Sequence, residues 1–178
     1  MYNNQRATRA PTNSIGLYIH FPFCLSKCLY CSFNSIPYDP DLARRYTEAI
    51  KKEIVIKAGE YRLEGRSLKT IYFGGGTPSI LSPSVIEDII AVSGRIFCLE
   101  DGIEITIEAN PDTLDREKLD GLSRIGTNRI SLGVQSFSDR YLNLLGRSHD
   151  TEKARRIFKA CRSTGFKNIS LDLIYALP

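Results

Sequence analysis

The stretch HFPFCLSKCLYCSF, residues 20–33, places three cysteines within a short run of aromatic and apolar residues. Cys24, Cys28 and Cys31 follow a C-x3-C-x2-C spacing. Pro22 and the β-prone run before it predict that these cysteines lie on a loop after a strand. Free cysteine is also a common core residue, but three thiols at this density and spacing indicate a metal or cluster site.

Two kinds of metal centre suit three cysteines. Zinc takes four ligands, and His20 is close enough in the sequence to be the fourth. Thiolates also hold iron–sulfur clusters, and a cubane bound by three of them keeps one iron open to an outside ligand. Apolar neighbours would then keep water from the cluster: Phe21, Phe23, Leu29, Tyr30 and Phe33.

Outward from this loop, β-prone runs alternate with helical patterns along the chain. Strands are predicted at residues 16–23, 69–73, 103–110, 128–137 and 167–178. Helices are predicted from residue 40 to at least residue 54, and at 82–97, 114–126, 138–145 and 151–165. This alternation predicts an α/β fold with a parallel sheet, either open and doubly wound or a (β/α) barrel. In both, functional residues gather at the carboxyl ends of the strands.

The composition, with 42% hydrophobic and 25% charged residues, is that of a globular protein, and its 24 basic and 20 acidic residues are interleaved. No basic block indicates a nucleic-acid or membrane partner, and no apolar run is long enough to span a bilayer. Residues 1–14 lack the apolar core of a secretory signal and are predicted to be a disordered tail before a domain at 15–178. The clustered cysteines favour the cytoplasm, where thiols stay reduced.

A C-x3-C-x2-C loop after the first strand resembles the cluster motif of the radical S-adenosylmethionine (SAM) enzymes. Further segments resemble the oxygen-independent coproporphyrinogen oxidase family: LYIHFPFC, YFGGGTPS, EANP, NRISLGVQSF, LGRSH and DLIYALP. The resemblance implies a partial (β/α)6 barrel with about five βα units present, and with the last unit and a C-terminal domain absent. It also implies a 4Fe-4S cluster whose open iron binds SAM. One electron then cleaves SAM to a 5′-deoxyadenosyl radical that abstracts hydrogen from the substrate.

The resemblance carries over to single positions. Cys24, Cys28 and Cys31 match the cluster ligands, and Tyr18 matches a tyrosine that lies against SAM. Three residues match the strand end that receives the methionine amino group: Gly75, Gly76 and Thr77. Glycine lets the backbone approach a ligand closely, although the same run read alone could form only a tight turn.

Four polar residues match contacts to the charged and hydroxyl groups of SAM. Glu108 matches the residue that binds the ammonium group of SAM, and Arg147 matches the residue that binds its carboxylate. Gln135 and Asp172 match the residues that bind the ribose hydroxyls. The chemistry agrees, because a carboxylate complements an ammonium and arginine binds a carboxylate as a fork. Taken one at a time, each could be a helix cap or a surface group. Their placement along successive strand ends favours the roles in SAM binding.

Two departures narrow the expected function. The oxidases carry a further cysteine two residues after the third ligand, where this chain has Phe33, and C-x3-C-x-Y-C-x-F resembles the HemW-type heme chaperones. Ala176 replaces the family's glycine, and the family continues beyond Pro178, so we expect a piece of a longer protein. Because Phe33 replaces the extra cysteine, we expect SAM cleavage but no oxidase activity.

The expected function is therefore that of a heme chaperone that binds the cluster, SAM and heme, with flavodoxin or ferredoxin as the electron donor. The alternatives are a coproporphyrinogen III oxidase, acting on that tetrapyrrole, and a zinc-stabilised structural domain. His149 lies in the segment LGRSH without an assigned role. Cys98 and Cys161 are expected within helices, outside the site.

Overall fold

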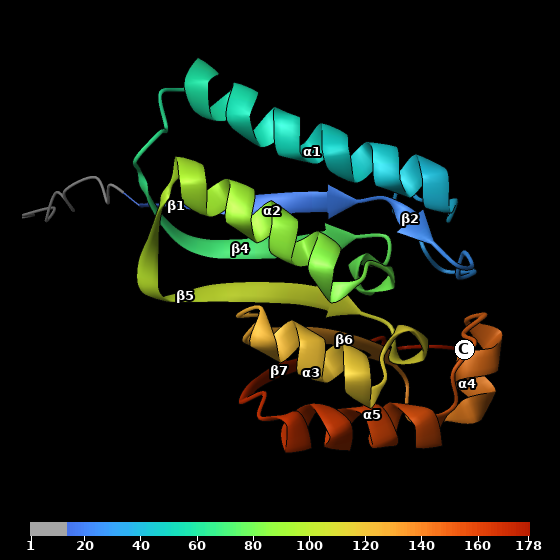
Figure 1. Ribbon diagram of the computed structural model, residues 1–178. Coiled ribbons are helices and arrows are strands. Elements are labelled where there is room, and N and C mark those ends of the chain that lie inside the picture. Colours follow the sequence, from blue (N-terminus) through green and yellow to red (C-terminus); the bar gives the residue numbers. More distant parts are fainter. Residues whose placement is uncertain (1–13) are drawn as a thin grey trace, which may run out of the picture.

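The structure is a computed structural model that describes residues 14–178 (Figure 1). Its strands are β1 (Ser14–Phe21), β2 (Phe23–Cys24), β3 (Ile36–Pro37), β4 (Ser67–Gly75), β5 (Cys98–Ala109), β6 (Arg129–Gln135) and β7 (Asn168–Leu173). Its α-helices are α1 (Pro40–Glu60), α2 (Pro83–Ile96), α3 (Arg116–Arg124), α4 (Asp139–Leu144) and α5 (Thr151–Thr164). Two short 3-10 turns are η1 (Pro78–Ile80) and η2 (Pro111–Thr113). The predicted tail lies outside the described residues, apart from Ser14, with which β1 begins.

Five strands form one parallel sheet in the order β1-β4-β5-β6-β7. Each βα unit adds its strand beside the preceding one, as in a (β/α) barrel, whereas a doubly wound sheet reverses its order at a switch point. Within residues 14–178, β1 and β7 are the two edges of this sheet, so the barrel is open. The prediction of a partial barrel is confirmed, with four complete βα units followed by the fifth strand, β7, and the doubly wound alternative is wrong.

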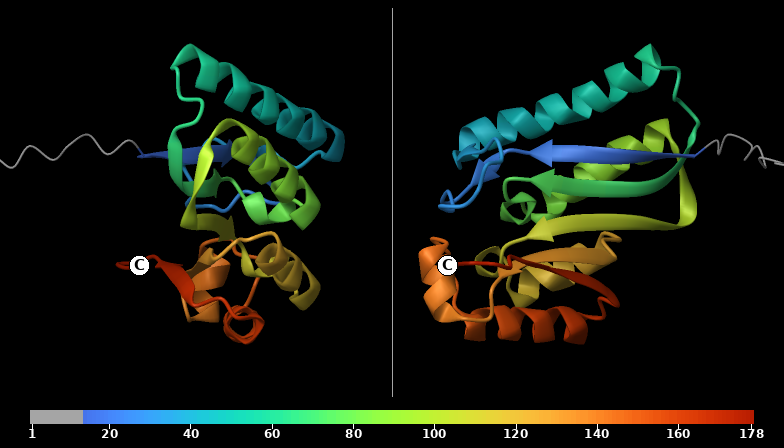
Figure 2. Two further views of the ribbon diagram at one scale, coloured as in Figure 1. Left: turned by 60° about the vertical axis from the view of Figure 1, so that its left-hand side comes forward. Right: turned by 180° about the vertical axis from the view of Figure 1, so that it is seen from behind.

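Helices α1, α2, α3 and α5 pack in a row along one face of the sheet (Figures 1 and 2). Aspartates cap α1 and α5: the Leu42 N–H donates to Asp39 Oδ1 at 2.7 Å, and the Lys153 N–H donates to Asp150 Oδ1 at 2.6 Å. α5 ends at Gly165 with φ 105°, the left-handed conformation that glycine adopts without strain.

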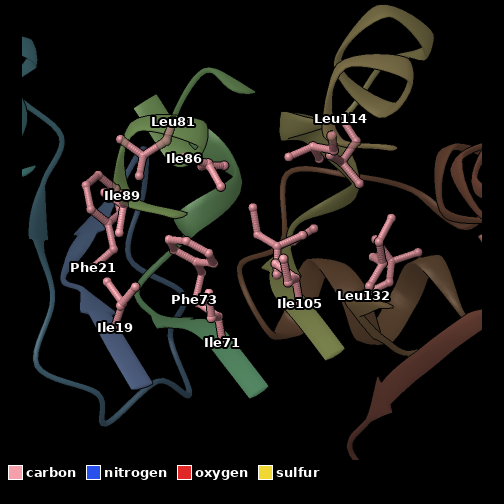
Figure 3. Close-up of a cluster of buried hydrophobic side chains, with 14 of the residues drawn as sticks. Ile19, Phe21, Ile71, Phe73, Leu81, Ile86, Ile89, Ile105, Leu114 and Leu132 are labelled. Carbon is pink, nitrogen blue, oxygen red and sulfur yellow. The ribbon is translucent and has the colours of Figure 1, made fainter. Parts of the chain in front are cut away.

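The hydrophobic core lies between these helices and every second residue of the strands. Figure 3 shows Phe21 of β1 and Phe73 of β4 beside Ile86 and Ile89 of α2, and all four side chains are fully buried. Burying a side chain of this size stabilises the fold by about 1.5–3 kcal/mol.

The residues between these core positions face the other side of the sheet, because successive side chains of a strand point to opposite faces. This second face is polar. Across the sheet, Tyr72 pairs with Thr106, Glu108 with Ser131, and Gly133 with Asp172. The right panel of Figure 2 shows this face, which the row of helices leaves open. The sheet therefore separates an apolar core from a polar surface on which a ligand site can form.

The prediction that Cys98 lies in a helix is wrong. α2 ends at Ile96, Phe97 is extended, and Cys98 is the exposed first residue of β5, paired with Ser67 of β4. Pairing with β4 extends β5 five residues before the alternating run in the sequence. Cys161 lies in α5 and is fully buried, as expected. Within the described part of the chain, no helix is long and apolar enough to cross a membrane.

Candidate functional site

A cavity of about 510 Å³ opens at the carboxyl ends of the strands. Its size lies within the range of about 300–1,000 Å³ that small-molecule sites use. All three motif cysteines line it, together with seven of the eight predicted SAM contacts: Gly75, Gly76, Thr77, Glu108, Gln135, Arg147 and Asp172. In Figure 1 the arrowheads of β1, β4 and β5 point to the end of the sheet where β2 and α4 also lie. The fold thus brings together residues that are up to 148 positions apart in the sequence, from Cys24 to Asp172.

The cysteine loop is tied to the rest of the site by its backbone. The short β2–β3 pair closes its base, where the Ile36 N–H donates to Pro22 O at 2.8 Å and the Tyr38 N–H donates to Cys24 O at 2.9 Å. The Leu29 N–H donates to Leu145 O at 3.1 Å, so the loop also contacts the end of α4. All three thiols are partly exposed, and this allows them to bond to a cluster seated in the cavity.

The thiols are suited to a cluster by their surroundings as well. Thr77 Oγ1 donates to Cys24 Sγ at 3.6 Å, and Arg147 Nη1 donates to Cys28 Sγ at 3.3 Å. Both donors would complement the negative charge of thiolates bonded to a cluster. Three soft thiolates facing a cavity fit an iron–sulfur cluster.

His20 does not join these cysteines. Its Nδ1 lies 2.9 Å from the Tyr18 hydroxyl, and the ring lines a separate groove with residues of α1 such as Tyr46. Among residues 14–178, no three His, Cys, Asp or Glu side chains are placed to hold one metal ion. The zinc site with His20 as fourth ligand is therefore not assembled by this structure.

Close contacts require a glycine at position 76, directly after β4. A Cβ on Gly76 would lie 2.6 Å from Phe23 O and 3.0 Å from Cys24 Sγ. The Gly76 N–H donates to Phe21 O, and the Thr77 N–H donates to Phe23 O, both at 2.8 Å. The glycine run therefore packs directly on the backbone that carries the first cysteine.

Both oxygens of Glu108 have partners inside the site. Tyr72 donates its hydroxyl to Oε1 at 2.8 Å, and the Gly75 N–H donates to Oε2 at 3.0 Å. Burial and this hydrogen bond with Glu108 raise the pKa of Tyr72, so its hydroxyl keeps its proton. Tyr72 is absent from the sequence prediction. The alternation in TIYFGG could have indicated it, because Tyr72, with its polar hydroxyl, lies between the core residues Ile71 and Phe73 and so points to the other face of the sheet.

Asp172 and Gln135 lie at the ends of the last two strands. Ser131 donates its hydroxyl to Asp172 Oδ1 at 3.2 Å, and Ser170 donates to Ser131 at 3.0 Å. Ser131 is a second site residue that the sequence prediction missed. Gln135 has φ 68°, and the Ile174 N–H donates to its carbonyl at 2.9 Å. A non-glycine residue adopts this backbone at an energetic cost, which is common at functional sites.

Arg147 reaches the cavity from the segment after α4. Its Nη2 donates to Gly133 O at 2.7 Å, and its Nε is buried without a partner in the described part of the chain. Tyr30 lies beside Arg147 and Cys28, and burial is the main cause that raises the pKa of this phenol to about 12. The guanidinium therefore stands between the cysteine loop and the carboxyl ends of the strands.

Tyr18 is the one predicted SAM contact that does not line the cavity. Its side chain is 57% exposed, and its ring stacks on Tyr72 with 5.9 Å between the centroids. Burial of the hydroxyl and the charge of Glu108 raise its pKa. Tyr18 therefore contacts the site through Tyr72, and its direct contact with SAM stays a prediction.

The fold and the cysteine loop define a class of protein. Residues 18–178 match the Radical SAM superfamily, so this chain belongs to that superfamily, whose members use a 4Fe-4S cluster and SAM. The chain is 39% identical over 171 residues to the heme chaperone HemW of Escherichia coli (strain K12), covering 92% of this chain and 43% of that protein. It is also 39% identical over 165 residues to the heme chaperone HemW of Bacillus subtilis (strain 168), covering 90% and 42%.

A solved structure agrees with this placement. Coproporphyrinogen III oxidase (HemN) from Escherichia coli, a radical SAM enzyme, superimposes with a TM-score of 0.86 at 34% identity, over 96% of this chain and 39% of that chain. The chain thus spans about two fifths of the length of the relatives that it matches.

Proposed function

We propose that this chain is the cluster- and SAM-binding part of a HemW-like heme chaperone. The observation that carries the proposal is one cavity lined by three thiols together with two carboxylates, a guanidinium and an amide, those of Glu108, Asp172, Arg147 and Gln135. Two relatives with 39% identity are named heme chaperones. The activity and partners of the whole protein are part of the proposal.

Each side chain has a chemical task in this cavity. Cys24, Cys28 and Cys31 hold the cluster, which supplies the electron for reductive cleavage of SAM when both are bound. Glu108, oriented by Tyr72 and the Gly75 N–H, receives the ammonium group of SAM. Arg147 receives the carboxylate, a pairing that its fork of donors suits.

The far end of the cavity suits the ribose. Asp172 accepts from hydroxyl groups and is already bonded to Ser131, so it is held at the rim. Gln135 supplies both a donor and an acceptor at the end of β6. Tyr30 and Phe33 line the same cavity beside the cysteines and limit the access of water.

Phe33 favours the chaperone over the oxidase. It lies at the cavity wall with 61% of its surface exposed, where the family resemblance gives the oxidases a cysteine. Because catalysis on a tetrapyrrole needs precise placement of its reacting carbon, a bulky ring at this wall disfavours that reaction. We further propose a flavodoxin or ferredoxin as the electron donor and heme as the cargo. We further propose a cytoplasmic location, because thiols that bind a cluster stay reduced in that compartment.

The cluster and SAM are tested first. Anaerobic reconstitution with iron and sulfide should give a brown protein, and Cys24→Ala, Cys28→Ala or Cys31→Ala should each bleach it. Cys98→Ala, at an exposed thiol outside the cavity, is the matched control and should leave the colour unchanged. Adding SAM should change the electron paramagnetic resonance spectrum of the reduced cluster. A colourless protein with stoichiometric zinc, or a spectrum indifferent to SAM, would contradict the proposal.

Heme binding and oxidase activity are tested on the full-length protein. With cluster, reductant and SAM, it should bind heme, seen by a shift of the heme absorption band, and should not decarboxylate coproporphyrinogen III. Phe33→Cys alone should not create that activity. Accumulation of protoporphyrinogen IX in the wild-type reaction would favour the oxidase.

A further inference from the structure

His149 is a buried side chain that the proposed function does not use. Only 4% of its surface is exposed, although it lies in a connection between α4 and α5. Its Nδ1 is 3.4 Å from Arg147 Nη2, and its Nε2 is 3.2 Å from Val134 O. One ring therefore touches both Arg147 and the strand end that carries Gln135.

These two partners define the protonation state of the ring. A guanidinium has donors only, so Nδ1 must accept, and a carbonyl only accepts, so Nε2 must carry the hydrogen. The neutral Nε2–H tautomer satisfies both contacts at once. Burial, followed by the charge of Arg147, lowers the pKa of His149 and agrees with a neutral ring.

The other contacts of Arg147 hold its two terminal nitrogens by one partner each and leave Nε without a partner, so a further contact restrains the guanidinium group. Nη2 donates to Gly133 O at 2.7 Å and Nη1 donates to Cys28 Sγ at 3.3 Å, while the buried Nε has no partner within residues 14–178. The contact with His149 holds Nη2 from a second direction. The guanidinium plane is then set between β6 and the cysteine loop.

The other partner of His149 lies next to a strained residue. Val134 O also accepts from the Ser136 N–H at 2.9 Å, so this carbonyl is held from two sides. The following residue, Gln135, has φ 68°. Such a conformation persists when the surroundings hold it in place, and His149 supplies one of these contacts.

We propose that His149 is a positioning residue that accepts from Arg147 and donates to Val134, and thereby fixes the guanidinium and the Gln135 turn for SAM. The inference rests on the proposed function, in which Arg147 receives the SAM carboxylate. It assigns a task to the one histidine of the segment LGRSH.

Three substitutions separate the two contacts. Asparagine keeps an acceptor near the place of Nδ1, glutamine keeps a donor near the place of Nε2, and phenylalanine keeps only the size of the ring. His149→Phe should weaken SAM binding about tenfold, the effect of a lost hydrogen bond of ordinary strength. His149→Asn should retain more affinity than His149→Gln. Ser148→Ala, at the exposed neighbour that bonds Asp112, is the matched control and should leave the affinity unchanged.

A double-mutant cycle tests whether His149 acts through Arg147. The dissociation constant of SAM is measured by calorimetry on the cluster-loaded protein, with iron content and thermal unfolding recorded for every variant. In the Arg147→Ala background, His149→Phe should have a clearly smaller effect on SAM affinity, because only the contact with Val134 beside Gln135 remains to be lost. An equal loss of affinity in both backgrounds would overturn the inference.

A spectroscopic measurement judges the contact without SAM. The sequence contains two histidines, so the His149→Phe variant assigns their signals in long-range 1H–15N spectra of the labelled, cluster-loaded protein in its oxidised state. At neutral pH the ring should be neutral with its hydrogen on Nε2. A hydrogen on Nδ1, or an imidazolium, would overturn the inference. If SAM does not bind, or binds equally to Arg147→Ala, the proposed function fails while this spectrum still decides the contact.

Discussion

At the scale of single residues, the site depends on backbone segments that pack so closely that only glycine fits between them. Gly76 lies against the backbone of Phe23 and the thiol of Cys24, and the peptide of Gly75 donates directly to Glu108. The carboxylate is thus oriented by a backbone group and a phenol rather than by a cation. Its negative charge remains available to an ammonium group.

Gly76→Ala should prevent stable cluster binding. The added Cβ would lie 2.6 Å from Phe23 O, so the cysteine loop must shift, and overpacking of this kind typically costs about 1–3 kcal/mol. The visible absorbance of the reconstituted cluster measures the effect. Gly94→Ala in α2 is the matched control, because its Cβ meets only the flexible Leu99 side chain at 3.3 Å and alanine favours a helix. A Gly76→Ala protein with full cluster content would contradict the expected clash.

Tyr72→Phe should weaken SAM binding about tenfold. The change keeps the ring that stacks on Tyr18 and removes only the hydroxyl that donates to Glu108, a bond to a charged group worth about 1.5 kcal/mol or more. Calorimetric titration with SAM measures the loss. Tyr38→Phe serves as control, since this ring packs on Phe23 and its hydroxyl has no hydrogen bond among the described residues. Equal affinities for Tyr72→Phe and the wild type would mean that Glu108 needs no orientation.

At the scale of elements, a polar joint connects the turns that follow β4 and β5. Ser79 of η1 is fully buried and bonded to Thr113 of η2, and its Oγ also accepts from the Asn110 N–H at 3.3 Å. Lys118 of α3 donates to Ser79 O at 2.6 Å and to Ile80 O at 3.3 Å. The strand ends that carry the glycines and Glu108 are therefore held at a fixed separation.

Lys118→Met should destabilise the protein by about 1–3 kcal/mol. Methionine keeps the length of the side chain but leaves two carbonyls of η1 without their donor, and unsatisfied buried groups cost this much. Urea unfolding followed by circular dichroism gives the change in the free energy of unfolding. Lys159→Met, at an exposed position on α5, should change it by no more than about 0.5 kcal/mol. An unchanged free energy of unfolding in Lys118→Met would show that the contact between the two turns does not depend on this amine.

Elements with a local signal could be predicted from the sequence. Asp39 with Pro40 marks the start of α1, and Gly165 marks the end of α5, because caps and left-handed glycines depend on neighbouring residues. Cys98 was misassigned because its strand pairing with Ser67 involves a residue 31 positions away. Pairs such as β2 and β3, with two residues each, are too short to give a periodic pattern.

Site residues divide in the same way. The position of Cys24 and Glu108 at the cavity could be predicted because their motifs are specific, while their roles in binding the cluster and SAM stay predictions. Tyr72 and Ser131 could not be predicted as motif residues, since their tasks arise from the register that sets them beside Glu108 and Asp172. The positive φ of Gln135 could not be predicted either, because this position holds no glycine and the conformation depends on tertiary contacts.

At the scale of the whole molecule, the site takes residues from every part of one open sheet. The central strands β4 and β5 are paired on both sides, whereas within residues 14–178 β7 is paired only with β6, and it is exposed at several positions. Local stability follows the number of buried contacts and protected hydrogen bonds. The rim that carries Asp172 is therefore less stable than the centre of the sheet.

Hydrogen exchange should show this gradient in the 178-residue chain. Amides of β4 and β5 should exchange slowest, and those of β7 fastest among the strands of the large sheet. β1 is the matched comparison, because it is also an edge strand but packs beneath α1 through Ile19 and Phe21. Mass spectrometry of peptides after timed deuteration measures the rates. Protection of β7 equal to that of β5 would contradict the gradient.

The sequential strand order has a consequence for biosynthesis. The ribosome releases the three cysteines well before Arg147 and Asp172. At about 5–20 residues per second, the thiols wait roughly seven to thirty seconds for the strands that complete their cavity. During this interval the three thiols of the nascent chain are exposed, because the later strands that wall the cavity have not yet been made. A cluster inserted before β7 is translated would therefore occupy a cavity that still lacks Asp172.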